Sequence, residues 1–121
     1  MDKNQKLELA YSLLREANEK IPVKTRKESM QVSEKVWAAF AQATKAYKDW
    51  KTERRYYSLI GELYSKYPEQ KQVIREAHRT ARLLHTDGFY EGMAYPTKED
   101  IESVEKGIEA IASILEIQKE V

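Results

Sequence analysis

Apolar residues recur at intervals of three and four positions along most of the chain, which is the spacing of one face of an α-helix. No stretch of useful length alternates apolar and polar residues as a half-buried β-strand does. The three prolines fall between the periodic segments, where helices end. The pattern therefore predicts an all-helical protein, with helices at about residues 3–20, 25–50, 53–66, 69–86 and from 97 onward.

Two of these helices begin with a capping-box pattern. Thr25 stands three residues before Glu28, and Thr97 stands three residues before Asp100. In such a box, each side chain can bond to the backbone N–H at the other position. The fourth helix is expected to end at Gly88, since glycine is the usual residue just past a helix C-terminus.

The last helix has the clearest core pattern, with branched apolar side chains at the a and d positions of a heptad. These residues are Ile101, Val104, Ile108, Ile111 and Leu115. In the second helix, Trp37 and Phe40 are also expected in the core. Several alanines of that helix allow another helix to approach closely, either inside the bundle or across a dimer interface.

The elements predict an up-and-down bundle of four long helices, with residues 53–66 as a shorter addition. The 121 residues fit one domain, so residues 1–121 are expected to form a single bundle. Residues 88–96 are rich in aromatic side chains. They are expected to form a loop that packs on the bundle.

Composition narrows the possible functions. The net charge is only +1, which argues against a strongly basic nucleic-acid coat but leaves room for a local basic patch. Cysteine is absent and there are two histidines, so disulfides, thiolate metal sites and a cysteine nucleophile are excluded and a structural zinc site is improbable. We expect no metal and no cofactor.

Residues 1–6 are not followed by an apolar run long enough for a signal peptide or a membrane span. We therefore expect a cytoplasmic protein with no membrane partner.

Both histidines and three arginines fall in one short stretch of the fourth helix, at Arg75, His78, Arg79, Arg82 and His85. At about 100° per residue, all of them except Arg79 lie within a sector of about 80°. Arg79 lies just beyond that sector, on the side away from the core. Neighbours at i,i+3 and i,i+4 can share one bound anion.

This combination suits phosphodiester chemistry. Arginine offers a planar fork to phosphate, and histidine exchanges protons near neutral pH. Together they can activate a ribose 2′-hydroxyl and stabilise the charge that develops at phosphorus, without a metal. The alternative is a solvated basic face near a helix C-terminus, with histidines that only pack and hydrogen-bond.

Two runs of sequence resemble a known family. The run 31–46, QVSEKVWAAFAQATKA, is similar to the helix-two signature of the archaeal PaREP family. The run 81–92, ARLLHTDGFYEG, resembles that family's second signature, a Leu-His-x-Asn-Phe-Tyr-Glu pattern. This family looks like a branch of the HEPN superfamily (higher eukaryotes and prokaryotes nucleotide-binding). The resemblance implies a small helical bundle that forms a homodimer.

The same resemblance implies specific roles. Many HEPN proteins are toxin ribonucleases with an Arg-x(4–6)-His motif, often paired with a nucleotidyltransferase antitoxin. Arg79 and His85 match that spacing, as phosphate clamp and general acid/base, and the dimer would join two copies in one cleft. Thr80 stands where the toxins commonly have Asn or Asp, and His85 lies at a helix end. The layout of an aromatic loop followed by a capped last helix resembles that of non-toxin HEPN proteins, in which binding rather than cleavage is suspected.

The remaining candidates would support this pair. They are Arg75, His78, Arg82, Asp87, Tyr90 and Glu91 as ligand-binding residues. The run Arg54-Arg55-Tyr56-Tyr57 mixes phosphate-binding and base-stacking types, but Tyr56 is expected to pack inward.

The leading expectation is therefore a nucleotide- or RNA-binding protein, extended to a metal-independent endoribonuclease of toxin–antitoxin type. The competing hypothesis is a non-catalytic module that oligomerises through the alanine-rich second helix and the apolar stripe of the last helix.

Overall fold

The computed structural model describes residues 1–90 and 95–119, and this part of the chain is helical, without strands. The helices are α1 (Lys3–Glu19), α2 (Arg26–Tyr47), α3 (Glu53–Lys66), α4 (Lys71–Leu83) and α5 (Lys98–Lys119). A 3₁₀ turn, η1 (Pro68–Gln70), precedes α4, and a π-helix, η2 (Leu84–Tyr90), follows it. The all-helical prediction is confirmed. The division into four long helices and one shorter one is not, because α3 has 14 residues and α4 has 13.

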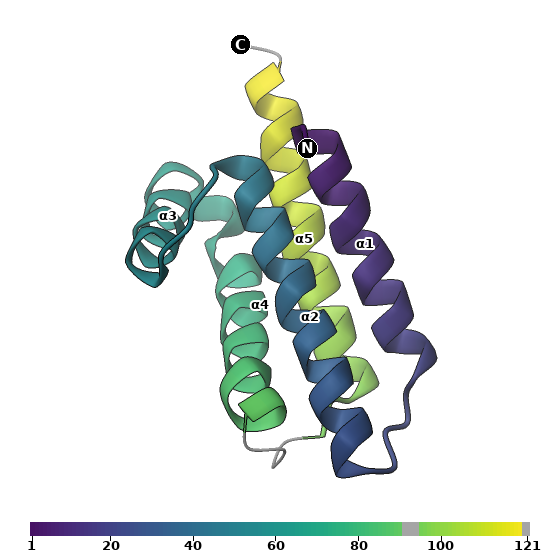
Figure 1. Ribbon diagram of the computed structural model, residues 1–121. Helices are drawn as coiled ribbons and strands as arrows, with labels where there is room; N and C mark the ends of the chain where they lie inside the picture. The colour runs from purple at the N-terminus through teal and green to yellow at the C-terminus, as the bar shows by residue number, and fades with distance from the viewer. Residues whose placement is uncertain (91–94, 120–121) are drawn as a thin grey trace.

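Four of the helices form a bundle, and α3 lies to one side of it (Figure 1). The helices α1, α2, α4 and α5 run side by side with alternating direction, and the start of α1 lies at the same end of the bundle as the last turn of α5 (Figure 1). The most extensive packing is between α1 and α2 and between α4 and α5.

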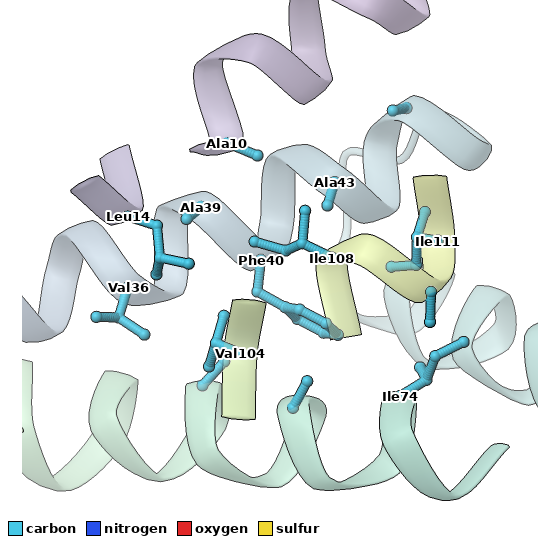
Figure 2. Close-up of a cluster of buried hydrophobic side chains, with 14 of the residues drawn as sticks. Ala10, Leu14, Val36, Ala39, Phe40, Ala43, Ile74, Val104, Ile108 and Ile111 are labelled. Atoms are coloured by element: carbon cyan, nitrogen blue, oxygen red, sulfur yellow. The ribbon is translucent and has the colours of Figure 1, made fainter. Parts of the chain in front are cut away.

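The core lies between the four bundle helices, as Figure 2 shows for side chains such as Leu14, Phe40, Ile74 and Ile108. All five residues of the predicted a/d stripe in α5 are buried, which confirms that prediction. Phe40 is completely buried, also as predicted. The alanines of α2 are used inside the chain: Ala39, Ala43 and Ala46 are at most 1% exposed.

One glycine sets how closely α4 and α5 approach. A Cβ atom built on Gly107 would overlap the Cβ of Ala77, and it would lie 3.5 Å from the Cε1 atom of Phe40. The two helix backbones are therefore packed at the distance that only glycine and alanine permit here.

Thr25 caps α2, since its Oγ1 accepts from the backbone N–H of Glu28 at 3.1 Å. The Glu28 carboxylate accepts from the Thr25 hydroxyl at 3.1 Å, so this cap is not the reciprocal box that the sequence predicts. The Thr97 pair is reciprocal: Asp100 N–H donates to Thr97 Oγ1 at 3.2 Å, and Thr97 N–H donates to Asp100 Oδ2 at 2.9 Å. The helix α2 ends at Tyr47, earlier than residue 50.

The prediction that Gly88 ends the fourth helix is wrong. The α-helix stops at Leu83 and widens into a π-helix that runs through Gly88 to Tyr90. Thr86 supports the transition, because its hydroxyl donates to the carbonyl oxygen of Arg82 at 3.1 Å. Residues 91–94 of the predicted loop lie outside the described part of the chain.

No helix among the described residues has the length and apolar character needed to cross a membrane.

Candidate functional site

An aromatic cluster joins α3 to the bundle. Tyr56 of α3 is 1% exposed and lies at its centre. Its ring meets Trp37 of α2 edge-on at 5.4 Å between centroids, and it lies 5.0 Å from Trp50 of the α2–α3 link. The prediction that Tyr56 packs inward is confirmed.

Trp37 is not a core residue, so that prediction is wrong. It is half-buried on the side of α2 that faces α3 and η2, where the aromatic cluster and a pocket lie. The reason is that α3 covers this side of the bundle incompletely, and a helix periodicity cannot tell a core face from a partly covered one.

The pocket beside the cluster has a volume of about 420 Å³ and contacts α2, the α2–α3 link, α3, α4 and η2. Its walls are Trp37, Trp50, Glu53, Tyr56, Arg82, His85 and Thr86. Aromatic walls with a few charged or titratable groups are typical of small-molecule sites.

Arg82 connects three elements at this pocket. Its Nη2 atom lies 2.7 Å from the Oε1 atom of Glu53, in an ion pair whose Arg82 side chain is 22% exposed. Its guanidinium lies over the rings of Trp37 at 5.3 Å and Tyr57 at 5.5 Å. The guanidinium is therefore held in place by one carboxylate and two aromatic faces.

His85 lies beside Arg82, on the π-helix. Its imidazole stacks on Trp37, with centroids 4.7 Å apart and planes inclined by 25°. Burial lowers the pKa of His85 and the charge of Arg82 lowers it further, while Glu53 and Glu34 act in the opposite direction. The neutral imidazole therefore predominates at pH 7, and it is able to accept a proton.

His78 has a different environment. Its Nδ1 atom and the hydroxyl of Tyr56 share a hydrogen bond of 2.6 Å, whose direction depends on the imidazole tautomer. Burial lowers the pKa of His78, and Arg82 and Arg79 lower it further. Burial also raises the pKa of the Tyr56 hydroxyl well above its usual range. His78 joins α4 to α3 and does not line the pocket.

The other predicted residues lie apart from the pocket. Arg75 and Arg79 are exposed. Burial raises the pKa of Tyr64 of α3, and the charges of Arg75 and Arg79 act in the opposite direction. Neither lines the pocket that holds His85. Asp87 is half-buried on η2. The Tyr90 side chain and Glu91 lie outside the described part of the structure.

Sequence reasoning missed several pocket residues. The sequence does not indicate that Trp50, Glu53 and Thr86 line a pocket, and it predicts that Trp37 lies in the core. A tryptophan in a link between helices, four residues before an Arg-Arg-Tyr-Tyr run, was the available signal for Trp50. Nothing local to Glu53 indicates that it meets Arg82, which is 29 residues away.

Within residues 1–90 and 95–119, His, Asp and Glu side chains do not gather in a group of three or more that could hold a metal ion.

Comparison with known proteins gives one assignment. Neither the curated proteins nor the solved structures include a match to this sequence. The model of the archaeal PaREP1/PaREP8 family matches residues 5–115. This range includes most of α1, most of α5 and all of the helices between them. The chain therefore belongs to the archaeal PaREP1/PaREP8 family.

Proposed function

We propose that this protein binds a nucleotide or RNA in the pocket between α2, α3 and α4, as an HEPN-like protein would. The observation that carries the proposal is the stack of His85 on Trp37 beside the fixed guanidinium of Arg82. A volume of about 420 Å³ falls in the range of small-ligand pockets. Exposed aromatic surface accepts a nucleobase, and arginine accepts phosphate.

The carboxylate of Glu53 occupies the place of an anion on Arg82. Its side chain is 64% exposed, so it can swing away at little cost, and a phosphate group would then take its place. The ion pair keeps Arg82 oriented in the absence of ligand. It also weakens phosphate binding, because the two anions compete for one cation.

Cleavage is the stronger form of the proposal. Neutral His85 would take the proton of a ribose 2′-hydroxyl, and the 2′-oxygen would attack phosphorus. The 5′-oxygen would leave with a proton from water, and the resulting hydroxide would take the proton from His85, giving a 2′,3′-cyclic phosphate, a free 5′-hydroxyl and neutral His85 again. Arg82 would stabilise the charge on the phosphoryl oxygens.

Arg79 enters this proposal through a second copy of the chain. It lies on the exposed face of α4, outside the pocket of its own chain. A homodimer that apposes the two α4 helices would bring Arg79 towards the pocket of its partner. A nucleotidyltransferase antitoxin remains the partner that the HEPN proposal implies.

The test measures binding and cleavage separately. Quenching of tryptophan fluorescence by adenosine monophosphate and by a short RNA reports binding, since Trp37 and Trp50 line the pocket. Cleavage is followed with the same RNA in EDTA. We expect Arg82→Ala to weaken binding about tenfold or more. His85→Ala should abolish cleavage.

Arg15→Ala is the matched control, because Arg15 is exposed on α1 and is not one of the walls of the pocket. It should leave binding unchanged. Equal binding by wild type and Arg82→Ala would overturn the proposed site. Equal cleavage by wild type and His85→Ala would overturn the catalytic form alone.

A further inference from the structure

A second pocket, of about 450 Å³, adjoins the first across the α2–α3 link. Lys48, Lys51 and Arg55 are among its walls, and it has Trp50 in common with the first pocket. The two hollows therefore meet at Trp50.

The indole of Trp50 is held in a fixed position. Its Nε1–H donates to the hydroxyl of Thr44 at 3.0 Å, and Thr44 is completely buried. The Thr44 hydroxyl in turn donates to the carbonyl oxygen of Ala41 at 2.7 Å. The ammonium group of Lys45 lies 4.7 Å from the centre of the Trp50 ring. Lys45 lies over this ring and the Tyr56 ring lies 5.0 Å from it, so Trp50 is a fixed aromatic wall with a cation beside it rather than an open stacking face.

Positive charge gathers around this wall. Residues 45–55 contain five basic residues and two acidic ones, a net charge of +3 in a chain whose total is +1. Both acidic residues face other cations, since Asp49 lies 3.7 Å from Lys6 and Glu53 is paired with Arg82. Glu62 also lines the second pocket and pairs with Lys48 at 3.2 Å, so the cations of this pocket that matter for a ligand are Lys51 and Arg55. Lys51 and Arg55 are exposed at the second pocket.

Resting on the proposed function, we infer that the ligand is a single-stranded RNA segment that spans both pockets, rather than a mononucleotide. One base occupies the pocket of Trp37 and His85. The chain then passes the wall formed by Trp50, and the following phosphates meet Lys51 and Arg55. Alternation of aromatic and basic groups along a surface is the arrangement that binds single strands.

The test is a length series. Binding of adenosine monophosphate is compared with single-stranded RNAs of about 2, 4 and 8 nucleotides and with a duplex of about 8 base pairs. We expect affinity to rise about tenfold or more from the mononucleotide to the tetramer, and the duplex to bind more weakly than the single strand.

The double variant Lys51→Gln/Arg55→Gln separates the two pockets. It should weaken binding of the octamer about fivefold to tenfold and reduce the slope of log K against log salt by about 1.4, at about 0.7 per phosphate contact. Binding of the mononucleotide should not change. Arg15→Gln/Lys24→Gln removes the same charge at exposed positions elsewhere and should leave both ligands unaffected.

The outcomes distinguish the two proposals. If the mononucleotide and the octamer bind with equal affinity, or if Lys51→Gln/Arg55→Gln leaves the affinity for the octamer unchanged, the inference that the strand spans both pockets is wrong. Either result leaves the proposed nucleotide pocket uncontradicted. A preference for the duplex overturns the inference as well. If no ligand of the series binds, the proposed function fails with it.

Discussion

Arg82 links α2, α3 and α4 through two aromatic rings and one carboxylate. Two functions fit such a residue. It can be a structural link that holds α3 against the bundle, or a phosphate-binding group that Glu53 occupies until a ligand arrives. The two interpretations give opposite results when Glu53 is neutralised, because only the second involves competition between anions.

Glu53→Gln should therefore strengthen RNA binding. Removing the competing carboxylate from Arg82 is expected to improve Kd by roughly fivefold, or about 1 kcal/mol. The free energy of unfolding should change by less than about 1 kcal/mol, since the carboxylate is largely exposed. Glu102→Gln, exposed on α5, is the charge-matched control. Unchanged affinity with reduced stability would identify Arg82 as a structural link only.

The two histidines make stability sensitive to acid. Both pKa values are lowered in the folded protein, mainly by burial. Below about pH 6.5 the unfolded chain therefore binds more protons than the folded one. The free energy of unfolding should be flat above that pH, and it should fall as the pH drops through 6.5 toward the folded pKa values.

His78→Gln tests this directly, with denaturant unfolding measured from about pH 8 down to pH 5. The variant should lose about 1 kcal/mol at pH 8, because the bond to Tyr56 is broken or weakened. It should also show a shallower loss below pH 6.5 than wild type. Parallel curves for the two proteins would show that His78 has no part in the acid sensitivity.

Among the elements, α5 depends on a single close approach to α4. The a/d stripe supplies the apolar surface, but Gly107 opposite Ala77 sets the distance between the helices. The stripe can be recognised in the sequence by its period. The close approach cannot be recognised in the sequence, because a glycine within a helix does not indicate which residue of another helix packs against it.

Gly107→Ala should destabilise the protein by about 1–3 kcal/mol, since the added methyl group must separate α4 from α5. Gly61→Ala is the matched control. Gly61 lies on α3 with nothing within 4 Å of the added Cβ, so alanine should stabilise by about 0.5–1 kcal/mol through helix propensity. Thermal unfolding of both variants checks this. A shift of the same sign in both would contradict the packing argument.

At the scale of the whole molecule, the position of α3 explains where the pocket lies. The bundle helices cover one another, whereas α3 lies to one side and meets the bundle through Tyr56 and its aromatic neighbours. The hollow next to this contact holds His85 and Arg82. Within one chain, Ala39, Ala43 and Ala46 of α2 and the stripe of α5 are buried, whereas Ala38 of α2 is half-buried.

The candidate site was only partly predictable. The basic stretch of residues 75–85 contributes Arg82 and His85 to the pocket. The HEPN resemblance pairs Arg79 with His85 through its motif spacing, while the fold places Arg82 with His85 in the pocket and Arg79 outside it. The difference arises because a helix wheel gives the angle between side chains but not which neighbouring element covers each one.

The sequence by itself determined the helical class, the positions of the helices and the buried face of α5, because apolar period, caps and prolines act within a few residues of one another. The family followed from the sequence as well. Only the tertiary structure decided that the fourth helix passes through Gly88 as a π-helix, that Trp37 faces a pocket, and that Glu53 meets Arg82. The pocket and the ion pair depend on where α3 lies, whereas the π-helix packs mainly on α2. Contacts between such distant segments leave no local pattern.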